Sequence, residues 1–333
     1  MSVVLCPQVD RLEQEGTWQA LTTVPLKFEL HRNEIWFRES WRAAVDVLGD
    51  RALELFQRLA ILTLKPDAVL ARNEHAVLDY MRDNGFLPVH AETFWYNRST
   101  TRELWRHQWN VATLDRIAVS DLVHYRTPAM TVFFLDTTDP LEIPAAPRLT
   151  RLKGSAFPVD REEWHLRERI GAPNRVMVQV HCPDEPADIV RELGVIFDED
   201  GLRRVYRALG RALDAPRAVD LSADLEKIEA DTEPVSLRIE PAVAAVREDL
   251  VRRARTASAA GRALESLDAA VNGGVLDWTD FRTALHTCGA RIDDWATVLV
   301  GSHYIQHDLP DAITAIPETG RRRWLRGEGL MIR

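Results

Sequence analysis

The chain has 333 residues, 46% of them hydrophobic and 28% charged, which suits a folded protein with room for two domains. Its formal net charge of −9 argues against a general nucleic-acid binder, because such binding needs a concentrated basic surface. Residues 1–11 lack the basic start and apolar run of a signal peptide, and no window approaches the roughly 18 apolar residues that span a bilayer. We therefore expect a cytoplasmic protein with neither a membrane segment nor a nucleic-acid partner.

Cysteine and histidine spacing indicates neither a disulfide framework nor a metal site. The three cysteines, Cys6, Cys182 and Cys288, lie far apart and form no CxxC pair, so we expect reduced thiols. Histidines such as His107 and His124 are scattered without the spacing of metal ligands, which is typical of residues at the surface or the edge of a core. We therefore predict no metal bound by the protein itself.

Apolar periodicity divides the chain into three parts. Residues 1–57 form a partly helical N-terminal extension, because apolar residues recur at helical spacing between Glu39 and Leu59. Residues 58–200 alternate between strand-like and helix-like segments. The expected segments are strands at 59–64, 86–96, 130–135 and 176–180 and helices at 74–83, 100–109 and 186–197. Such alternation predicts an α/β or split βαβ layered fold.

From residue 201 onward the sequence is rich in Ala, Arg, Leu and Glu, a composition typical of helices. We predict a helical C-terminal domain at 201–333, with a long helix over 241–271 that ends at Asn272-Gly273-Gly274. The Arg-rich segment 321–326 near the end of the chain is typical of an exposed terminus.

His181 is the candidate nucleophile. It ends the expected strand at 176–180 and precedes Pro186, a residue that suits the first turn of a helix, so its side chain would face an anion-attracting helix N-terminus. Glu192 follows eleven residues later, where a helix would place its carboxylate behind the imidazole and fix the tautomer of the ring. An imidazole oriented in this way can carry a phosphoryl group between two substrates.

Lys65 and Arg167 are candidate phosphate-binding residues. Lys65 ends the first expected strand, and Arg167 lies in the loop before the last one. Their charges could hold the β- and γ-phosphates of a nucleotide and neutralise charge in the transition state. Arg167 also belongs to the charged run Arg-Glu-Arg, so a solvated surface is the alternative interpretation for that residue.

Several motifs resemble those of the nucleoside diphosphate kinase family. In chain order they are Leu64-Lys65-Pro66-Asp67-Ala68-Val69, Asn84-Gly85-Phe86, Leu122-Val123-His124-Tyr125, His165-Leu166-Arg167, and His181 with Glu192. The resemblance covers roughly residues 58–200. It implies a ferredoxin-like βαββαβ sheet that binds a nucleoside triphosphate with its Mg²⁺, held through the nucleotide. It also implies that His181 accepts the γ-phosphate and passes it to a second substrate.

The same resemblance implies two further binding residues. A second phosphate-binding arginine falls at Arg151 or Arg148. The family asparagine that contacts ribose falls on Val178, and Asn174 is the candidate to replace it.

Other family positions have changed, mostly where the family contacts ribose and base. The family serine after the histidine is Pro183, its tyrosine falls on Asn110, and its stacking aromatic falls near Ala118. These changes favour an unknown small-molecule acceptor in place of a standard nucleoside diphosphate. They leave open a nucleotide-binding regulatory or assembly protein without phosphotransfer, and a nucleotidyl transferase on the same fold. The family is commonly oligomeric, so a homo-oligomer is also open.

Overall fold

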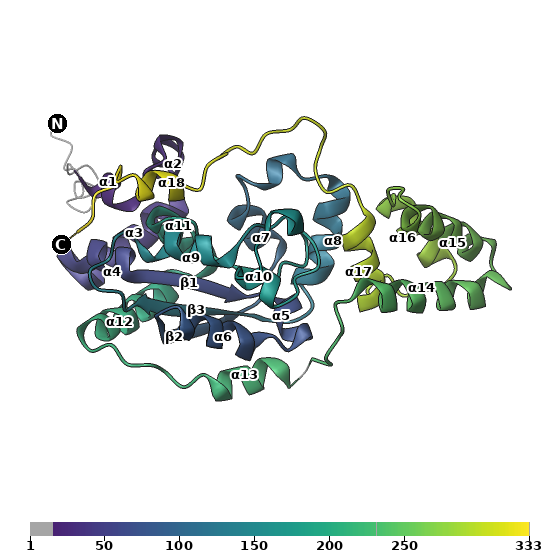
Figure 1. The fold of residues 1–333 in the computed structure, drawn as a ribbon, viewed down its shortest axis with the longest axis horizontal. Helices are drawn as coiled ribbons and strands as arrows, with labels where there is room; N and C mark the ends of the chain where they lie inside the picture. Colours follow the sequence, from purple (N-terminus) through teal and green to yellow (C-terminus); the bar gives the residue numbers. More distant parts are fainter. Residues whose placement is uncertain (1–15, 231, 333) are drawn as a thin grey trace.

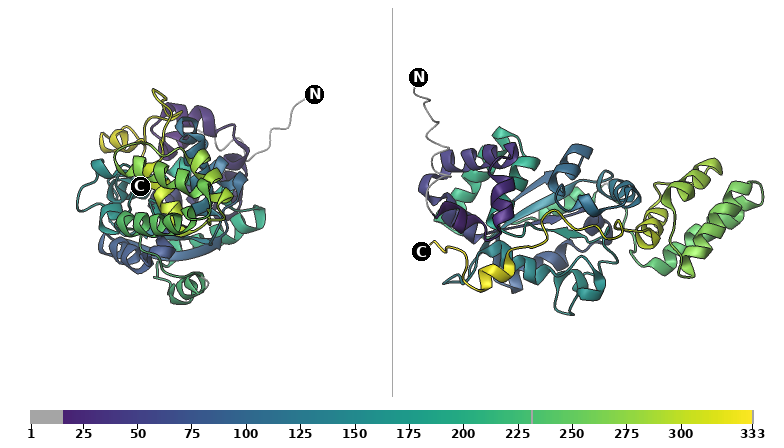
Figure 2. Two further views of the ribbon diagram at one scale, coloured as in Figure 1. Left: turned by 90° about the vertical axis from the view of Figure 1, so that its right-hand side faces the viewer. Right: turned by 90° about the horizontal axis from the view of Figure 1, so that it is seen from above.

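The structure is a computed structural model that describes residues 16–230 and 232–332, so Cys6, expected to be a reduced thiol, lies outside the described part. The molecule is elongated: a layered α/β body carries a smaller helical lobe at one end (Figures 1 and 2). No helix in the described ranges is both long and apolar enough to cross a membrane.

A four-stranded sheet forms the centre of the body. Its strands are β1 (Leu59–Leu64), β2 (Phe86–Phe94), β3 (Ala129–Asp136) and β4 (Val180–His181). The spatial order is β2-β3-β1-β4, and every neighbouring pair is antiparallel. Helices fill the β1–β2 and β3–β4 connections, so the body has the ferredoxin-like βαββαβ arrangement that we expected.

Helices cover both faces of the sheet, and β1 is therefore buried along its whole length. Leu59 and Ile61 pack into one core, whereas Leu62 and Leu64 pack into the other, as the alternation of side chains along a strand requires. The first core is closed by α3 (Ile35–Leu48), α4 (Ala52–Arg58), α11 (Pro186–Ile196) and α12 (Glu199–Asp214). The second is closed by α5 (Pro66–Ala71), α6 (Glu74–Asp83), α9 (Ala145–Lys153), α10 (Leu166–Arg169) and α13 (Ser222–Glu229).

The remaining short elements lie at the N-terminus and in the connections. Helices α1 (Thr17–Leu21) and α2 (Pro25–His31) precede α3, and α7 (Arg98–Leu104) and α8 (Leu114–His124) join β2 to β3. Single 3₁₀ turns are η1 (Gly49–Arg51), η2 (Trp109–Val111) and η3 (Pro158–Asp160).

The lobe consists of α14 (Ile239–Ala254), α15 (Ser258–Val271), α16 (Trp278–Thr287) and α17 (Trp295–Tyr304). Its core includes Val119 and Val123 of α8 and also Val176 and Met177, so α17 and its neighbours pack directly onto the body. The helical stretch expected over 241–271 consists of two helices, α14 and α15. The backbone of Ala257 is extended, and it separates α14 from α15 so that the two helices pack side by side.

The C-terminal segment leaves the lobe and runs back over the body. Helix α18 (Arg321–Leu325), yellow in Figure 1, packs against α9, and Thr23 Oγ1, between α1 and α2, donates to the Gly320 carbonyl at 3.2 Å. The Leu330 N–H donates to the Gln19 carbonyl at 2.9 Å, and Gln57 Nε2 donates to the Leu330 carbonyl at 2.6 Å. The domain boundaries at 57/58 and 200/201 stay predictions, although most of α12 lies beyond the second boundary and packs in the first sheet core.

Most predicted strands and helices of the body are confirmed, with two local differences. The helix expected at 100–109 is regular only over α7 and continues as turns and η2. The strand expected at 176–180 pairs only at its end, as β4. It starts late because Asn174 Oδ1 accepts the backbone N–H groups of Val176 and Met177, which curls the chain there.

Candidate functional site

A cavity of about 250 Å³ opens where β1 ends beside β4. Three of the predicted site residues, Lys65, Arg167 and His181, line it. Further lining side chains, none of them predicted as site residues, include Trp105, Trp109, Arg116, His124, Lys153, Arg175 and Asp184. The fold therefore brings residues from the end of β1, from α10 and from β4 to one place.

His181 is held with its two ring nitrogens in different environments. Its backbone pairs with Thr63 of β1, and its Nε2 lies 2.8 Å from Glu192 Oε2, one turn before the end of α11. Because the carboxylate accepts the proton on Nε2, the lone pair of the ring belongs to Nδ1. The indole N–H of Trp105, in the cavity wall, donates weakly to that Nδ1 at 3.4 Å. The nitrogen with nucleophilic character is thus Nδ1.

The chain approaches His181 through a strained turn at Gln179. This residue has a positive φ of 63°, and the Val180 N–H donates to the Val178 carbonyl at 2.7 Å, which closes a γ-turn. Such a backbone costs on the order of 1–3 kcal/mol unless its surroundings hold it. Here Asp67 Oδ2 accepts the Gln179 N–H at 2.7 Å. The first turn of α5 therefore fixes the turn that orients His181.

Lys65 is buried at the start of α5, immediately after β1. Its ammonium donates to the Val176 carbonyl at 3.0 Å and lies 3.5 Å from Asp67 Oδ1. Burial lowers the pKa of Lys65, and nearby Arg167 lowers it further. The charge of Lys65 is thus only partly compensated by its own neighbours.

Arg167 is also buried, although it lies in a charged run of the sequence. Its two terminal nitrogens donate to the carbonyls of Gly154 at 3.1 Å and Val180 at 2.9 Å, and its Nε has no partner in the described part of the chain. Burial lowers the pKa of Arg167 to about 10. The alternative of a solvated surface residue therefore does not apply to Arg167.

Three further cations line the cavity. Arg116 and Arg175 both bond to Asp308, a residue of the C-terminal segment, with 2.6 Å between Arg116 Nη1 and Asp308 Oδ1. Burial lowers the pKa of Arg116, and the charge of Arg175 adds to this effect. Lys153 Nζ donates to the Cys182 carbonyl at 3.2 Å. Because lysine is scarce in this sequence, Lys153 could have been singled out as a candidate site residue. No local sequence feature identifies the two arginines as site residues.

The cavity is therefore strongly cationic. Asp184 is the single carboxylate among its described lining residues. The cations are Lys65, Arg116, Lys153, Arg167 and Arg175. Buried charges without full compensation are costly, and a bound anion with several negative oxygens would relieve that cost. The arrangement suits a polyphosphate.

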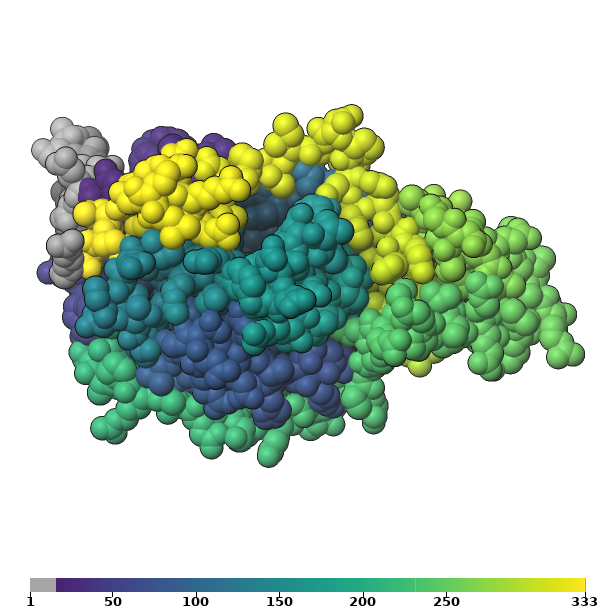
Figure 3. Space-filling view, in the orientation of Figure 1, coloured from purple at the N-terminus to yellow at the C-terminus, as the bar shows by residue number. Residues whose placement is uncertain are grey.

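The other predicted residues lie elsewhere. Arg151 lines a wider depression of about 1030 Å³ that shares Lys153 and Arg167 with the first cavity. The molecular surface is hollowed between the yellow C-terminal segment and the teal β3–β4 connection (Figure 3). The amide nitrogen of Asn174 donates to Ser302 in the lobe, and Arg148 pairs with Asp136, so neither lines the cavity.

Aromatic side chains were also missed by the sequence reasoning, which placed the family's stacking residue near Ala118. Trp105 and Trp109 line the cavity and stack on one another with ring centroids 5.5 Å apart. They follow α7 and so lie in the β2–β3 connection, before Ala118.

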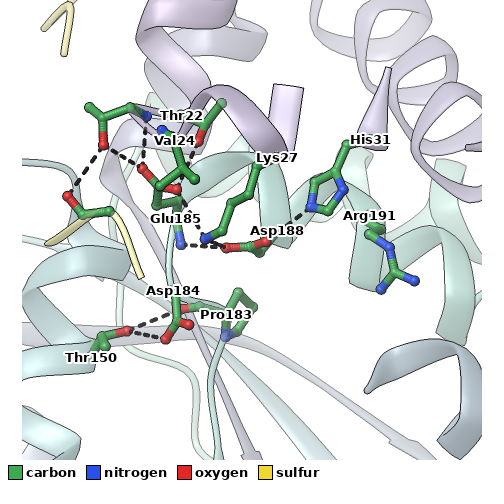
Figure 4. Close-up of polar contacts among 12 residues, drawn as sticks. Thr22, Val24, Lys27, His31, Thr150, Pro183, Asp184, Glu185, Asp188 and Arg191 are labelled. Carbon is green, nitrogen blue, oxygen red and sulfur yellow. Dashed lines mark hydrogen bonds and ion pairs between the residues drawn. The ribbon is translucent and has the colours of Figure 1, made fainter. Parts of the chain in front are cut away.

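Buried polar contacts hold the loop after His181 in place (Figure 4). The Glu185 carboxylate accepts from Thr22 Oγ1 at 2.8 Å and from Trp324 Nε1 at 2.8 Å, and it pairs with Lys27 at 3.0 Å. Lys27 also donates to Asp188 at 2.6 Å. Both ends of the described chain thus converge on the loop that joins β4 to α11.

The chain thus contains a ferredoxin-like domain with a cationic cavity at the end of β1. No protein-family model and no curated protein matches the chain. Among solved structures, it matches the Aquifex aeolicus nucleoside diphosphate kinase, with 16% sequence identity over 42% of this chain and 95% of that chain and a TM-score of 0.35. The similarity concerns the fold alone.

Proposed function

We propose that this chain is a phosphotransferase that moves the γ-phosphate of ATP or another nucleoside triphosphate through His181 to an acceptor. The observation that carries the proposal is the cationic cavity around an imidazole whose Nε2 is held by Glu192. Positive charge positions a polyphosphate, and the oriented imidazole provides a nucleophile that can hold a phosphoryl group between two half-reactions.

In this scheme Lys65 and Arg167 hold the β- and γ-phosphates, and Mg²⁺ arrives bound to the nucleotide. Both side chains are buried with depressed pKa values, mainly because of that burial, so an incoming phosphate gains a strong partner. Asp184, also in the cavity wall, is an oxygen ligand of the kind that Mg²⁺ prefers.

The transfer consists of two half-reactions, each with one nucleophilic attack on the transferred phosphorus. His181 Nδ1 attacks the γ-phosphorus, the bond from that phosphorus to the β,γ-bridging oxygen breaks, and the nucleoside diphosphate leaves with that bond's electrons. The Nε2 proton stays hydrogen-bonded to Glu192, which stabilises the positive ring. A nucleophilic oxygen of the acceptor then attacks the phosphorus and restores the free imidazole.

The wider depression beside the cavity is the proposed place of the acceptor. It is lined by Arg151, Trp164 and Arg321 and adjoins the cavity at Lys153 and Arg167. A small molecule with an anionic group and an apolar portion would suit such a surface.

Incubation with γ-labelled ATP and Mg²⁺ tests the proposal. We expect acid-labile label on the wild-type protein and none on His181→Ala, whereas His75→Ala, at an exposed position of α6, keeps it. Pyrophosphate release without protein label would instead indicate nucleotidyl transfer. A thermal shift with ATP but no transfer of any kind would leave only the regulatory alternative.

A further inference from the structure

A second cavity, of about 150 Å³, lies on the other side of His181, and several polar side chains meet there. His31 ends α2, Glu34 directly precedes α3, and His107 lies in the turns between α7 and η2. One potential ligand atom from each of these three residues lies within 4.8 Å of the others. The fold therefore brings the imidazole of His107 to the imidazole of His31 and the carboxylate of Glu34, which lie far from it in sequence.

His31 has a buried, oriented ring with one nitrogen that can bind a ligand. It is 1% exposed, its Nε2 lies 3.1 Å from Asp188 Oδ1, and its Nδ1 has no partner in the described ranges (Figure 4). A buried ring nitrogen without a partner is costly. The carboxylate on Nε2 fixes the ring and places the lone pair on Nδ1, as carboxylates do behind metal-binding histidines.

Two neighbouring side chains orient the carboxylate of Glu34. Its Oε1 lies 3.0 Å from His107 Nε2, and its Oε2 accepts from Arg191 Nε. Arg191 therefore orients the carboxylate through one oxygen and leaves the other toward His107.

We propose that His31 Nδ1, Glu34 and His107 bind a divalent transition-metal ion of the Zn²⁺ type. Two histidines, one carboxylate and an open fourth position form a ligand set that Zn²⁺ takes in proteins. The fourth position faces the cavity, since His31 and His107 both line it.

Binding needs only a small rearrangement. Metal–ligand bonds of about 2.0–2.1 Å place tetrahedral donors about 3.3 Å apart, so the three donors close in from their present spacing. The His107–Glu34 hydrogen bond is exchanged for two metal bonds, and the proton on His107 Nε2 moves to the other ring nitrogen. The ion would then join α2 and α3 to the segment that contains His107 and Trp105. The side chain of Trp105 lines the cationic cavity.

Metal titration of the full chain tests this site without reference to phosphotransfer. After chelation and dialysis, we expect one Zn²⁺ or Co²⁺ per chain with a dissociation constant tighter than about 10 μM, the visible absorption of tetrahedral Co²⁺, and a higher Tm. His107→Gln and Glu34→Gln should each weaken binding on the order of 100-fold. His75→Gln, at an exposed position, should bind as the wild type does.

Two outcomes overturn the proposal. One is a wild-type chain that binds neither Zn²⁺ nor Co²⁺ at ion concentrations up to about 10 μM, the weakest affinity that the proposal allows. The other is a His107→Gln variant that folds, by circular dichroism, and keeps wild-type affinity, because the ion would then lie elsewhere. His31→Ala serves only as a third variant, since loss of this buried ring also disturbs packing.

Discussion

The two nitrogens of His181 have different tasks in the proposed reaction, and Glu192 separates them. A neutral amide in place of the carboxylate keeps the size of the side chain but no longer stabilises a positive ring. We expect Glu192→Gln to slow label incorporation from γ-labelled ATP by on the order of 10²-fold, with little change in Tm. Glu168→Gln, at an exposed position of α10, is the matched control. Equal rates of label incorporation for the two variants would show that Glu192 has no part in the phosphoryl transfer.

Single residues differ in how well the sequence predicts their positions. Lys65 and Glu192 follow from local order, because one directly follows a strand and the other lies on the helix that begins shortly after His181. Arg116 and Arg175 gain their place through Asp308, which is distant from both in sequence. His31 and His107 likewise meet only in the folded chain. No spacing rule can find contacts of that kind.

At the level of elements, the contact between α2 and α11 depends on one buried ammonium. Lys27 lies 3.0 Å from Glu185 and 2.6 Å from Asp188, and the pKa of Asp188 is depressed: burial opposes this, but Lys27 outweighs it. Lys27→Met would remove the ammonium from the buried carboxylate of Glu185 and the half-buried carboxylate of Asp188. We expect a loss of about 3–5 kcal/mol in the free energy of unfolding, measured by urea denaturation.

Lys227→Met is the control for that variant, because Lys227 is exposed on α13. It should change the free energy of unfolding by less than about 0.5 kcal/mol. If both variants lose equally little, the buried ion pairs do not hold α2 in place.

The start of α6 makes stability depend on pH. Burial raises the pKa of Glu74 to about 7, with a further contribution from Glu229. Since the folded pKa exceeds the unfolded value of about 4.5, the stabilising effect is complete below pH 4.5 and is lost as the pH rises through 7. Glu74→Gln should therefore raise the free energy of unfolding by about 1–3 kcal/mol at pH 8 and hardly change it at pH 4. An equal gain at both pH values would contradict this assignment.

Elements follow from the sequence where local patterns decide them. The apolar run of β1 and the Asn-Gly stop after α6 were sufficient signals. The late start of β4 was not visible, since it depends on the Asn174 side chain and on the left-handed backbone of Gln179. Side-chain hydrogen bonds and one strained residue override the strand propensity of that segment.

At the level of the whole molecule, the C-terminal segment connects the lobe to the cationic cavity. Asp308 holds Arg116 and Arg175 together and partly neutralises both. Asp308→Asn should lower the Tm, because two like charges then face each other, and should enlarge the thermal stabilisation by ATP severalfold. Asp311→Asn, at an exposed neighbouring position, should do neither. An unchanged thermal stabilisation by ATP would show that the C-terminal segment does not influence nucleotide binding.

The arrangement of the termini could not be inferred from composition. Helical periodicity correctly indicated helices after residue 201, but it cannot show that Trp324 reaches Glu185, in the loop that follows His181. Tertiary contacts decide where an amphipathic or irregular segment packs. The extensions therefore support the site in addition to enlarging the protein.

The position of the phosphoryl group on His181 is the most direct test of the proposed mechanism. Because Glu192 occupies Nε2, phosphorylation by γ-labelled ATP must give the Nδ1 isomer of phosphohistidine, which ³¹P NMR and mass spectrometry of the labelled peptide can distinguish from the Nε2 isomer. An Nδ1 adduct on the wild type, absent from His181→Ala, is the expected result. An Nε2 adduct, or none while ATP is bound, would contradict the proposed mechanism.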